Sequence, residues 1–560
     1  MNAVLPPPAV PTIWTTGTTE GHHTGTWRAA TPRHIAAPSP CHQACPVGGE
    51  IAQWIGQARS GDLHGAWQTL MRHNPFPAVA GRICHHPCEA ACNRGAHDEA
   101  LSICRLERWV GDAALEHGWL PEAPPPATGA RVAVVGGGPA GLSAAYQLRR
   151  LGHAVTLFEA ADTLGGVMRH GIPAYRLSRR VLDGEIARIV ALGLDLRCGR
   201  AVRGDDAFAE LGRDHDAVFV ALGAQRPRSL GPVGAGRPWM MDGARYLAAC
   251  SRGQPPDLGP RVVVVGGGSA AIDVARSARR QGHAVTLLAL EPQARMPAQR
   301  DEVVEALEEG IELVDGAMLG TVHEAGDAGL RLQCVRVRFE PGAERGRFTV
   351  TPLPGSDFQL DADAVLTAIG QDPLLGDLAA HWQRRGELLW TDGTGLTSDA
   401  RVWAGGDLTS MARFVTEAVG MGARAARAID RALRARGAEA AARGPAEAAA
   451  EPVVTLASIN LHDHPPSARA PSPRRSAGER VADQDEVQLG LTASQALAEA
   501  ARCFSCGSCI HCDQCVTYCP DLAVQRVGDG YRVNTDYCKG CGVCVRECPT
   551  GSMAMSEDTK

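Results

Sequence analysis

Short apolar runs and helix-spaced apolar residues alternate along most of the chain. RVAVV at 131–135 and RVVVV at 261–265 are β-rich, and each is followed by a glycine-rich loop and then by helical periodicity. This order predicts two strand–loop–helix units, at about 131–159 and 261–288. A further strand is expected to end near residue 405 with a helix after it, and helical patterns such as IAQWIGQARSGDLHGAWQTLM fall within 41–120.

Three stretches interrupt this pattern and divide the chain. Residues 1–40 are rich in Pro, Thr and Gly and predict an extended arm, PEAPPPATG at 121–129 reads as a linker, and the Ala-, Pro- and Arg-rich stretch 437–491 predicts a long tether. The expected domains are a helical domain (41–120), a discontinuous dinucleotide domain (130–245 and 385–436), a second dinucleotide domain inserted into it (246–384), and a C-terminal cysteine-rich domain (492–560).

Both units carry the fingerprint of dinucleotide binding. In the first, Gly-x-Gly-x-x-Gly supplies a tight turn, a close backbone approach to a pyrophosphate and close helix packing, and an acid ends the second strand. The second unit repeats this plan with Ala in the third position. Two units in one chain indicate two different dinucleotides. The predicted residues are Gly136, Gly138, Pro139, Ala140, Gly141 and Glu159 in the first unit, and Gly266, Gly268, Ser269, Ala270, Ala271 and Glu291 in the second.

Composition excludes several other classes of protein. The 560 residues exceed what one core organises, so two to four domains are expected. Aromatic residues make up only 4%, and the net charge is −6 without a basic block, which argues against a nucleic-acid partner. No apolar run is long enough to span a membrane, and the N-terminus lacks the pattern of a signal peptide, so a cytoplasmic protein is expected.

The nineteen cysteines are clustered, which in a reducing compartment favours metal over disulfides. Near the C-terminus, two runs follow the spacing Cys-x2-Cys-x2-Cys-x3-Cys-Pro of bacterial ferredoxins, in which the fourth cysteine of each run binds the other cluster. Zinc is the alternative, but it would favour paired CxxC motifs. The predicted sets are Cys509, Cys512, Cys515 and Cys548 for one [4Fe–4S] cluster, and Cys519, Cys538, Cys541 and Cys544 for the other.

A second cysteine group near the N-terminus, together with the nucleotide loops, resembles a known family. CHQACP, GRIC…PCEAAC, GGGPAGLSAA, LGGVMRHGIPAYRL and GGGSAAIDVAR, over about residues 40–435, are similar to the small subunit of glutamate synthase and to the N-terminal half of dihydropyrimidine dehydrogenase. The resemblance implies that the first loop, with Gly166, Gly223, Gly406 and Asp407, holds FAD and that the second holds NAD(P). The implied fold is multidomain, with an α-helical Fe–S domain, an α/β Rossmann-like flavoprotein with two dinucleotide-binding domains, and a C-terminal α+β bacterial ferredoxin domain.

The resemblance also implies two N-terminal [4Fe–4S] clusters. One would be bound by Cys45, Cys84, Cys88 and Glu107, and the other by Cys41, Cys92 and an upstream CxxC that this chain lacks. The family's missing pair has the form EAxRCxxC, and AEAARCFSC at 498–506 matches it. Our hypothesis is that Cys503 and Cys506 complete the cluster, within one chain or across a homodimer. Alternatively they are spare thiols, or Cys104 supplies a ligand. His42, His85 and His86 are interpreted as loop residues that form hydrogen bonds.

These parts indicate an NAD(P)H:acceptor oxidoreductase with FAD and three to four [4Fe–4S] clusters. Because the second unit reads Leu290-Glu291 where the family carries arginines, NAD(H) is expected rather than NADP(H). No motif for a catalytic acid, base or nucleophile is present. Resemblance gives candidate partner complexes: dissimilatory sulfite reductase, 2-oxoacid oxidoreductases or a glutamate synthase large subunit. A non-catalytic electron-wiring scaffold and a bifurcating flavoprotein stay as alternatives.

Overall fold

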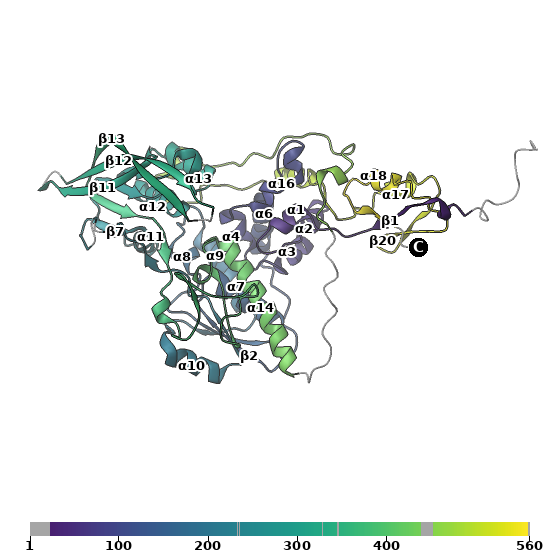
Figure 1. The fold of residues 1–560 in the computed structure, drawn as a ribbon, viewed down its shortest axis with the longest axis horizontal. Coiled ribbons are helices and arrows are strands. Elements are labelled where there is room, and N and C mark those ends of the chain that lie inside the picture. Colours follow the sequence, from purple (N-terminus) through teal and green to yellow (C-terminus); the bar gives the residue numbers. More distant parts are fainter. Residues whose placement is uncertain are drawn as a thin grey trace, which may run out of the picture.

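In the computed structural model, a helical N-terminal domain lies between two dinucleotide domains and a C-terminal cysteine domain (Figure 1). The structure describes residues 23–557 except 232, 234–235, 327–328, 344–345 and 438–451. Within these residues, no helix has the length and apolar character needed to cross a bilayer.

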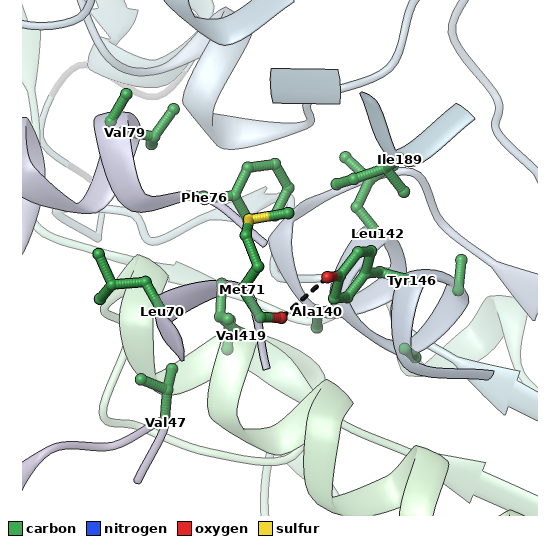
Figure 2. Packing of buried hydrophobic residues seen from close by; sticks show 14 of the residues in the cluster. Val47, Leu70, Met71, Phe76, Val79, Ala140, Leu142, Tyr146, Ile189 and Val419 are labelled. Atoms are coloured by element: carbon green, nitrogen blue, oxygen red, sulfur yellow. Dashed lines mark hydrogen bonds between the residues drawn. The ribbon is translucent and has the colours of Figure 1, made fainter. Parts of the chain in front are cut away.

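The N-terminal domain is a set of short helices that shares its core with the first dinucleotide domain. Phe76 and Met71 pack against Leu142 and Tyr146, and the Tyr146 hydroxyl donates to the Met71 carbonyl at 2.8 Å (Figure 2). The shared core makes the two domains one packed unit. The helices are α1 (Pro40–Ala44), α2 (Ile51–Arg59), α3 (Leu63–Met71), α4 (Pro77–Ile83), α5 (Pro87–Ala90), η2 (Asn93–Ala96) and α6 (Ile103–Glu116).

The first dinucleotide domain is built on a parallel five-stranded sheet in the order β18-β5-β2-β3-β4. β18 comes from the later stretch of chain and pairs with β5, so the domain is discontinuous in sequence. Its strands are β2 (Arg131–Val135), β3 (Ala154–Phe158), β4 (Asp195–Arg197), β5 (Ala217–Val220) and β18 (Val402–Ala404); its helices are α7 (Pro139–Arg150), α8 (Val167–His170), α9 (Arg179–Val190), α10 (Gly204–Asp214), η6 (Gly406–Leu408) and α14 (Val415–Gly437).

The second dinucleotide domain repeats this architecture, with the order β10-β9-β8-β14-β7 and an antiparallel sheet β11-β12-β13 beside it. Its elements are β7 (Met240–Asp242), α11 (Gly243–Ser251), β8 (Arg261–Val265), α12 (Ser269–Arg280), β9 (Ala284–Leu288), η3 (Gln293–Arg295), α13 (Arg300–Glu308), β10 (Glu312–Val314), β11 (Ala317–Glu324), β12 (Leu330–Pro341), β13 (Phe348–Ala362) and β14 (Ala364–Thr367). Short elements join the two domains: β6 (Arg226–Pro227) with β15 (Gln371–Asp372), η5 (Leu375–Asp377), and β16 (Arg384–Arg385) with β17 (Leu388–Leu389).

The C-terminal cysteine domain is small and is completed by the N-terminal segment. The predicted arm is extended in part, but Ala30–His34 forms strand β1 and pairs antiparallel with β21, in register from Ala30 opposite Glu557 to His34 opposite Met553. The two ends of the described chain are therefore tied together. The elements are η1 (Gly25–Trp27), β1, α17 (Gln514–Thr517), β19 (Val524–Val527), β20 (Gly530–Val533), α18 (Val543–Arg546) and β21 (Met553–Glu557).

The described part of the expected tether, residues 452–491, packs against the rest of the protein. It contains η7 (Leu456–Ser458) and α15 (Ala477–Arg480) and leads into α16 (Ala493–Ala501). Glu499 of α16 is buried and accepts hydrogen bonds from Ser102 N at 2.8 Å and Ala470 N at 2.7 Å, and Arg502 donates to the same carboxylate at 2.8 Å. The buried Glu499 carboxylate thus links this segment, through Ala470 N, to the N-terminal domain, through Ser102 N.

Candidate nucleotide cavity and cysteine clusters

Both glycine loops open into one cavity of about 1730 Å³ between the two dinucleotide domains. Of the residues predicted to hold dinucleotides, all line this cavity except Gly141 and Ala271, which pack where each helix meets its strand. One continuous space is therefore available to two dinucleotides. The lining residues are Gly136, Gly138, Pro139, Ala140, Glu159, Gly166, Gly223, Gly406 and Asp407 from the first domain, and Gly266, Gly268, Ser269, Ala270 and Glu291 from the second.

The first loop has the geometry that only glycine allows. Gly136 has φ +108°, and a Cβ there would lie 2.4 Å from the Ala221 carbonyl oxygen. At Gly141 a Cβ would lie 1.8 Å from the Gly136 oxygen, so the start of α7 sits directly against the loop. The Glu159 carboxylate accepts from Gly137 N at 2.7 Å and Ala161 N at 2.8 Å, and this fixes the acid at the end of β3 beside the loop.

The turn containing Gly406 and Asp407 packs against the first loop and lines the same cavity. Gly406 has φ +73°, and a Cβ there would lie 3.2 Å from the Ala140 side chain. Burial raises the pKa of Asp407, and the nearby Arg413 opposes that shift. Arg413 also lines the cavity, and sequence reasoning missed it because only its place in the fold brings it to Asp407.

The second loop repeats the first closely. Gly266 has φ +143°, and a Cβ there would lie 2.5 Å from the Ala368 carbonyl oxygen. The Glu291 carboxylate lies against Gly267, since a Cβ on that glycine would come within 2.3 Å of Glu291 Oε2. Burial raises the pKa of Glu291, and Leu290 and Arg295 line the cavity beside it.

The structure brings Cys503 and Cys506 to the N-terminal domain of the same chain. They border a small cavity together with Cys41 and Cys92, and Asn93 Nδ2 donates to Cys506 Sγ at 3.5 Å. Burial, with some repulsion from the neighbouring thiols, raises the pKa of Cys503 to about 11 and that of Cys506 to about 12. Four thiols around one cavity fit the all-cysteine ligand set of a cubane, and no second copy of the chain is needed to assemble the set.

The second N-terminal set also meets, on the side of the domain that faces the nucleotides. Cys45, Cys84, Cys88 and Glu107 are mutual electrostatic neighbours. Asn74 Nδ2 donates to Glu107 Oε1 at 2.8 Å, and burial raises the pKa of Glu107 to about 7. No spacing rule in the sequence pointed to Asn74. These donors fit a cubane with three thiolates and one carboxylate.

The other polar residues among these cysteines have local partners. The buried Cys104 points its Sγ at the Ala80 carbonyl oxygen at 3.5 Å. His42 Nδ1 is 2.7 Å from the Gly49 carbonyl oxygen, and the His85 ring stacks on Phe414 with 3.8 Å between centroids. His86 adopts φ +49° and lies 3.9 Å from Glu89. These contacts agree with loop and core roles for the four residues.

The C-terminal thiols fall into the two sets expected from the ferredoxin spacing. Cys548 is an electrostatic neighbour of Cys509 and Cys515, and Cys519 is one of Cys538 and Cys544. The fourth cysteine of each run thus crosses to the other set. Among the described residues, no group of three or more His, Cys, Asp or Glu side chains is placed to bind a single metal ion. In a cubane, by contrast, each protein ligand binds a different iron atom. The remaining members are Cys512 in the first set and Cys541 in the second.

Two dinucleotide domains around one cavity, flanked by cysteine-rich domains, define an FAD- and Fe–S-dependent NAD(P)H oxidoreductase. Residues 130–422 match the family described as pyridine nucleotide-disulphide oxidoreductase, and the chain belongs to that family. Residues 30–119 match dihydropyrimidine dehydrogenase domain II, 4Fe-4S cluster, and residues 508–552 match the 4Fe-4S dicluster domain. The expected resemblance, fold class and enzyme class are confirmed.

Known relatives cover most of the chain. It is 36% identical to the NADP(+)-dependent formate dehydrogenase subunit beta of Moorella thermoacetica, over 84% of this chain and 70% of that protein. It is 32% identical to the NADPH-Fe(3+) oxidoreductase subunit beta of Geobacter sulfurreducens, over 84% and 75%, and 35% identical to the glutamate synthase [NADPH] small chain of Mycobacterium tuberculosis, over 70% and 85%. All three names describe one subunit of an NADP(H)-linked enzyme.

Proposed function

We propose that this chain is the electron-transfer subunit of an NAD(H)-linked oxidoreductase that exchanges electrons with a partner redox enzyme. The observation that carries the proposal is the position of Cys84. Its Sγ lies 3.5 Å from Thr416 Oγ1, while the adjacent Ile83 and Val415 line the nucleotide cavity. A cluster on Cys84 would therefore border the space that holds the dinucleotides.

The chain's residues would divide the work by position. The first loop, Glu159 and Asp407 would hold FAD, and the second loop with Glu291 would hold NAD(H) in the same cavity. Bound FAD would connect the two-electron chemistry of a nicotinamide with one-electron transfer. Four cysteine sets would hold four [4Fe–4S] clusters.

The partner is a redox protein or complex, since the relatives are named as subunits. Resemblance favours dissimilatory sulfite reductase or a 2-oxoacid oxidoreductase, with a glutamate synthase large subunit as the second candidate.

The function is tested by mixing oxygen-free protein with NADH. We expect the flavin absorbance to bleach, because both loops open into one cavity, and reduced-cluster signals to follow in electron paramagnetic resonance spectra. A flavin that NADH and NADPH both leave oxidised, but that dithionite bleaches, would make the chain a non-catalytic scaffold.

Glu291 should set the choice of nicotinamide. Its carboxylate beside Gly267 can accept from ribose hydroxyls and would repel a 2′-phosphate. We expect flavin reduction to favour NADH over NADPH, and Glu291→Gln to lower that preference by about tenfold, which corresponds to roughly 1.4 kcal/mol. The measurement is kcat/KM for each nucleotide. Glu312→Gln, on an exposed carboxylate of β10 outside the cavity, is the control. Faster reduction by NADPH in the unaltered protein would contradict the assignment.

A further inference from the structure

The segment 473–489, which we call the strap, connects three domains. It folds back on itself, because Arg475 N donates to the Val487 oxygen at 3.0 Å and Leu489 N to the Pro473 oxygen at 2.9 Å. An ion pair between Arg475 and Asp483, at 2.5 Å, closes the loop internally. The strap lies between α13 and α16 (Figure 1). The strap therefore has a defined conformation held by its own hydrogen bonds and ion pair.

Beneath the strap, the first dinucleotide domain inserts two side chains into the second. Tyr175 is completely buried, and the Arg280 guanidinium lies over its ring at 3.8 Å. Arg176 forms ion pairs with Asp273 at 2.6 Å and Glu302 at 2.5 Å, on α12 and α13. These contacts join the two domains that enclose the nucleotide cavity.

On its outer side, the strap binds α13 of the second dinucleotide domain. Glu308 accepts from Arg474 at 2.7 Å and from Arg480 at 2.7 Å. The Arg480 side chain is only 4% exposed, whereas its partner Glu308 is 34% exposed, so the guanidinium is buried at the edge of α13. Gln488 donates to Glu305, one turn earlier on the same helix. Three contacts thus fix α13 to the strap.

On its inner side, the strap binds the other two domains through Glu486. The Glu486 carboxylate accepts from Arg82 Nε at 2.6 Å and Arg108 Nη2 at 2.9 Å, both in the N-terminal domain. It also accepts from Ser178 N at 3.0 Å, and Val487 N donates to the Tyr175 oxygen at 2.9 Å, both in the first dinucleotide domain. One short segment therefore contacts all three domains around the cavity.

We propose that the strap is a positioning element for hydride exchange: Arg474, Arg480 and Glu486 hold the second dinucleotide domain at the angle that joins both glycine loops in one cavity. The strap leads within a few residues into α16, and α16 leads to Cys503 and Cys506. The strap would therefore position the second dinucleotide domain, and the chain that continues from it carries two cluster ligands. The proposal rests on the proposed function, since it concerns how that reaction is aligned.

The test is the double variant Arg474→Gln/Arg480→Gln in the full-length holoprotein. We expect flavin reduction at saturating NADH to slow about tenfold or more, because small misplacement of reacting groups is costly. The dissociation constant for NAD+ and the iron content should stay unchanged. Hydrogen–deuterium exchange of 300–308 should rise several-fold. The single variant Arg480→Lys, which keeps a cation near Glu308, should retain most of the flavin-reduction rate of the unaltered protein.

The matched control is Asp483→Asn, which removes only the internal pair of the strap and leaves its contacts with α13 in place. Unaltered exchange of 300–308 in the double variant, or raised exchange with an unchanged rate, overturns the proposal. The two failures are distinguishable: if NADH leaves the flavin of the unaltered protein oxidised, the proposed function fails, while the exchange measurement still tests the strap. Glu308→Gln gives a second route should the double variant fold poorly.

Discussion

Protein purified without oxygen should carry about sixteen irons per flavin, and Cys503→Ser/Cys506→Ser should lose about four of them. The structure places these thiols at one cavity with Cys41 and Cys92, so removing both leaves only two ligands. A cubane held by two thiolates on one side would not survive purification. Iron and acid-labile sulfide per flavin are the quantities to measure.

The control for this variant is Cys198→Ser. Cys198 is exposed and lies outside the four cysteine sets, so the iron content of the Cys198→Ser variant should equal that of the unaltered protein. If the double variant keeps all its iron, Cys503 and Cys506 are spare thiols and the N-terminal cluster must be completed by other ligands. Loss of all iron together would indicate unfolding, and retention of the flavin distinguishes that outcome from loss of one cluster.

Local sequence patterns predicted the parts whose geometry is itself local. The glycine loops, the acid Glu159 and the ferredoxin runs depend on spacings of a few residues, and each lies where its spacing indicated. AEAARCFSC matches the missing family pair, and the structure places Cys503 and Cys506 at one cavity with Cys41 and Cys92. That these four thiols bind a cluster stays a prediction.

Long-range pairings were beyond the reach of the sequence. The pairing of β1 with β21 joins segments more than 500 residues apart, and the sequence ATPRH of β1 does not indicate which strand it pairs with. The expected tether was wrong for residues 452–491 for a similar reason. Its Arg-rich composition is typical of a solvated linker, yet Arg469 and Arg480 form ion pairs with Glu89 and Glu308. Composition reports the charges but not the carboxylates that pair with them.

The second large effect is expected from a matched pair of substitutions in the two glycine loops. Gly136 and Gly266 occupy equivalent positions in the two loops. A Cβ at Gly136 would lie 2.4 Å from the Ala221 carbonyl oxygen, and a Cβ at Gly266 would lie 2.5 Å from the Ala368 carbonyl oxygen. Both also have positive φ, which a β-branched residue does not tolerate. Each valine should therefore distort only its own loop.

We expect Gly136→Val to be purified without FAD, and Gly266→Val to keep FAD while NADH bleaches it at least about a hundredfold more slowly. Dithionite should still reduce the flavin and the clusters of Gly266→Val, because the first loop and the cysteine sets are untouched. The measurements are flavin content and stopped-flow absorbance. The opposite result, with FAD lost from Gly266→Val and retained in Gly136→Val, would exchange the two nucleotide assignments. Because the two loops are so alike in shape, this pair tests which dinucleotide each one holds rather than whether the fold tolerates valine.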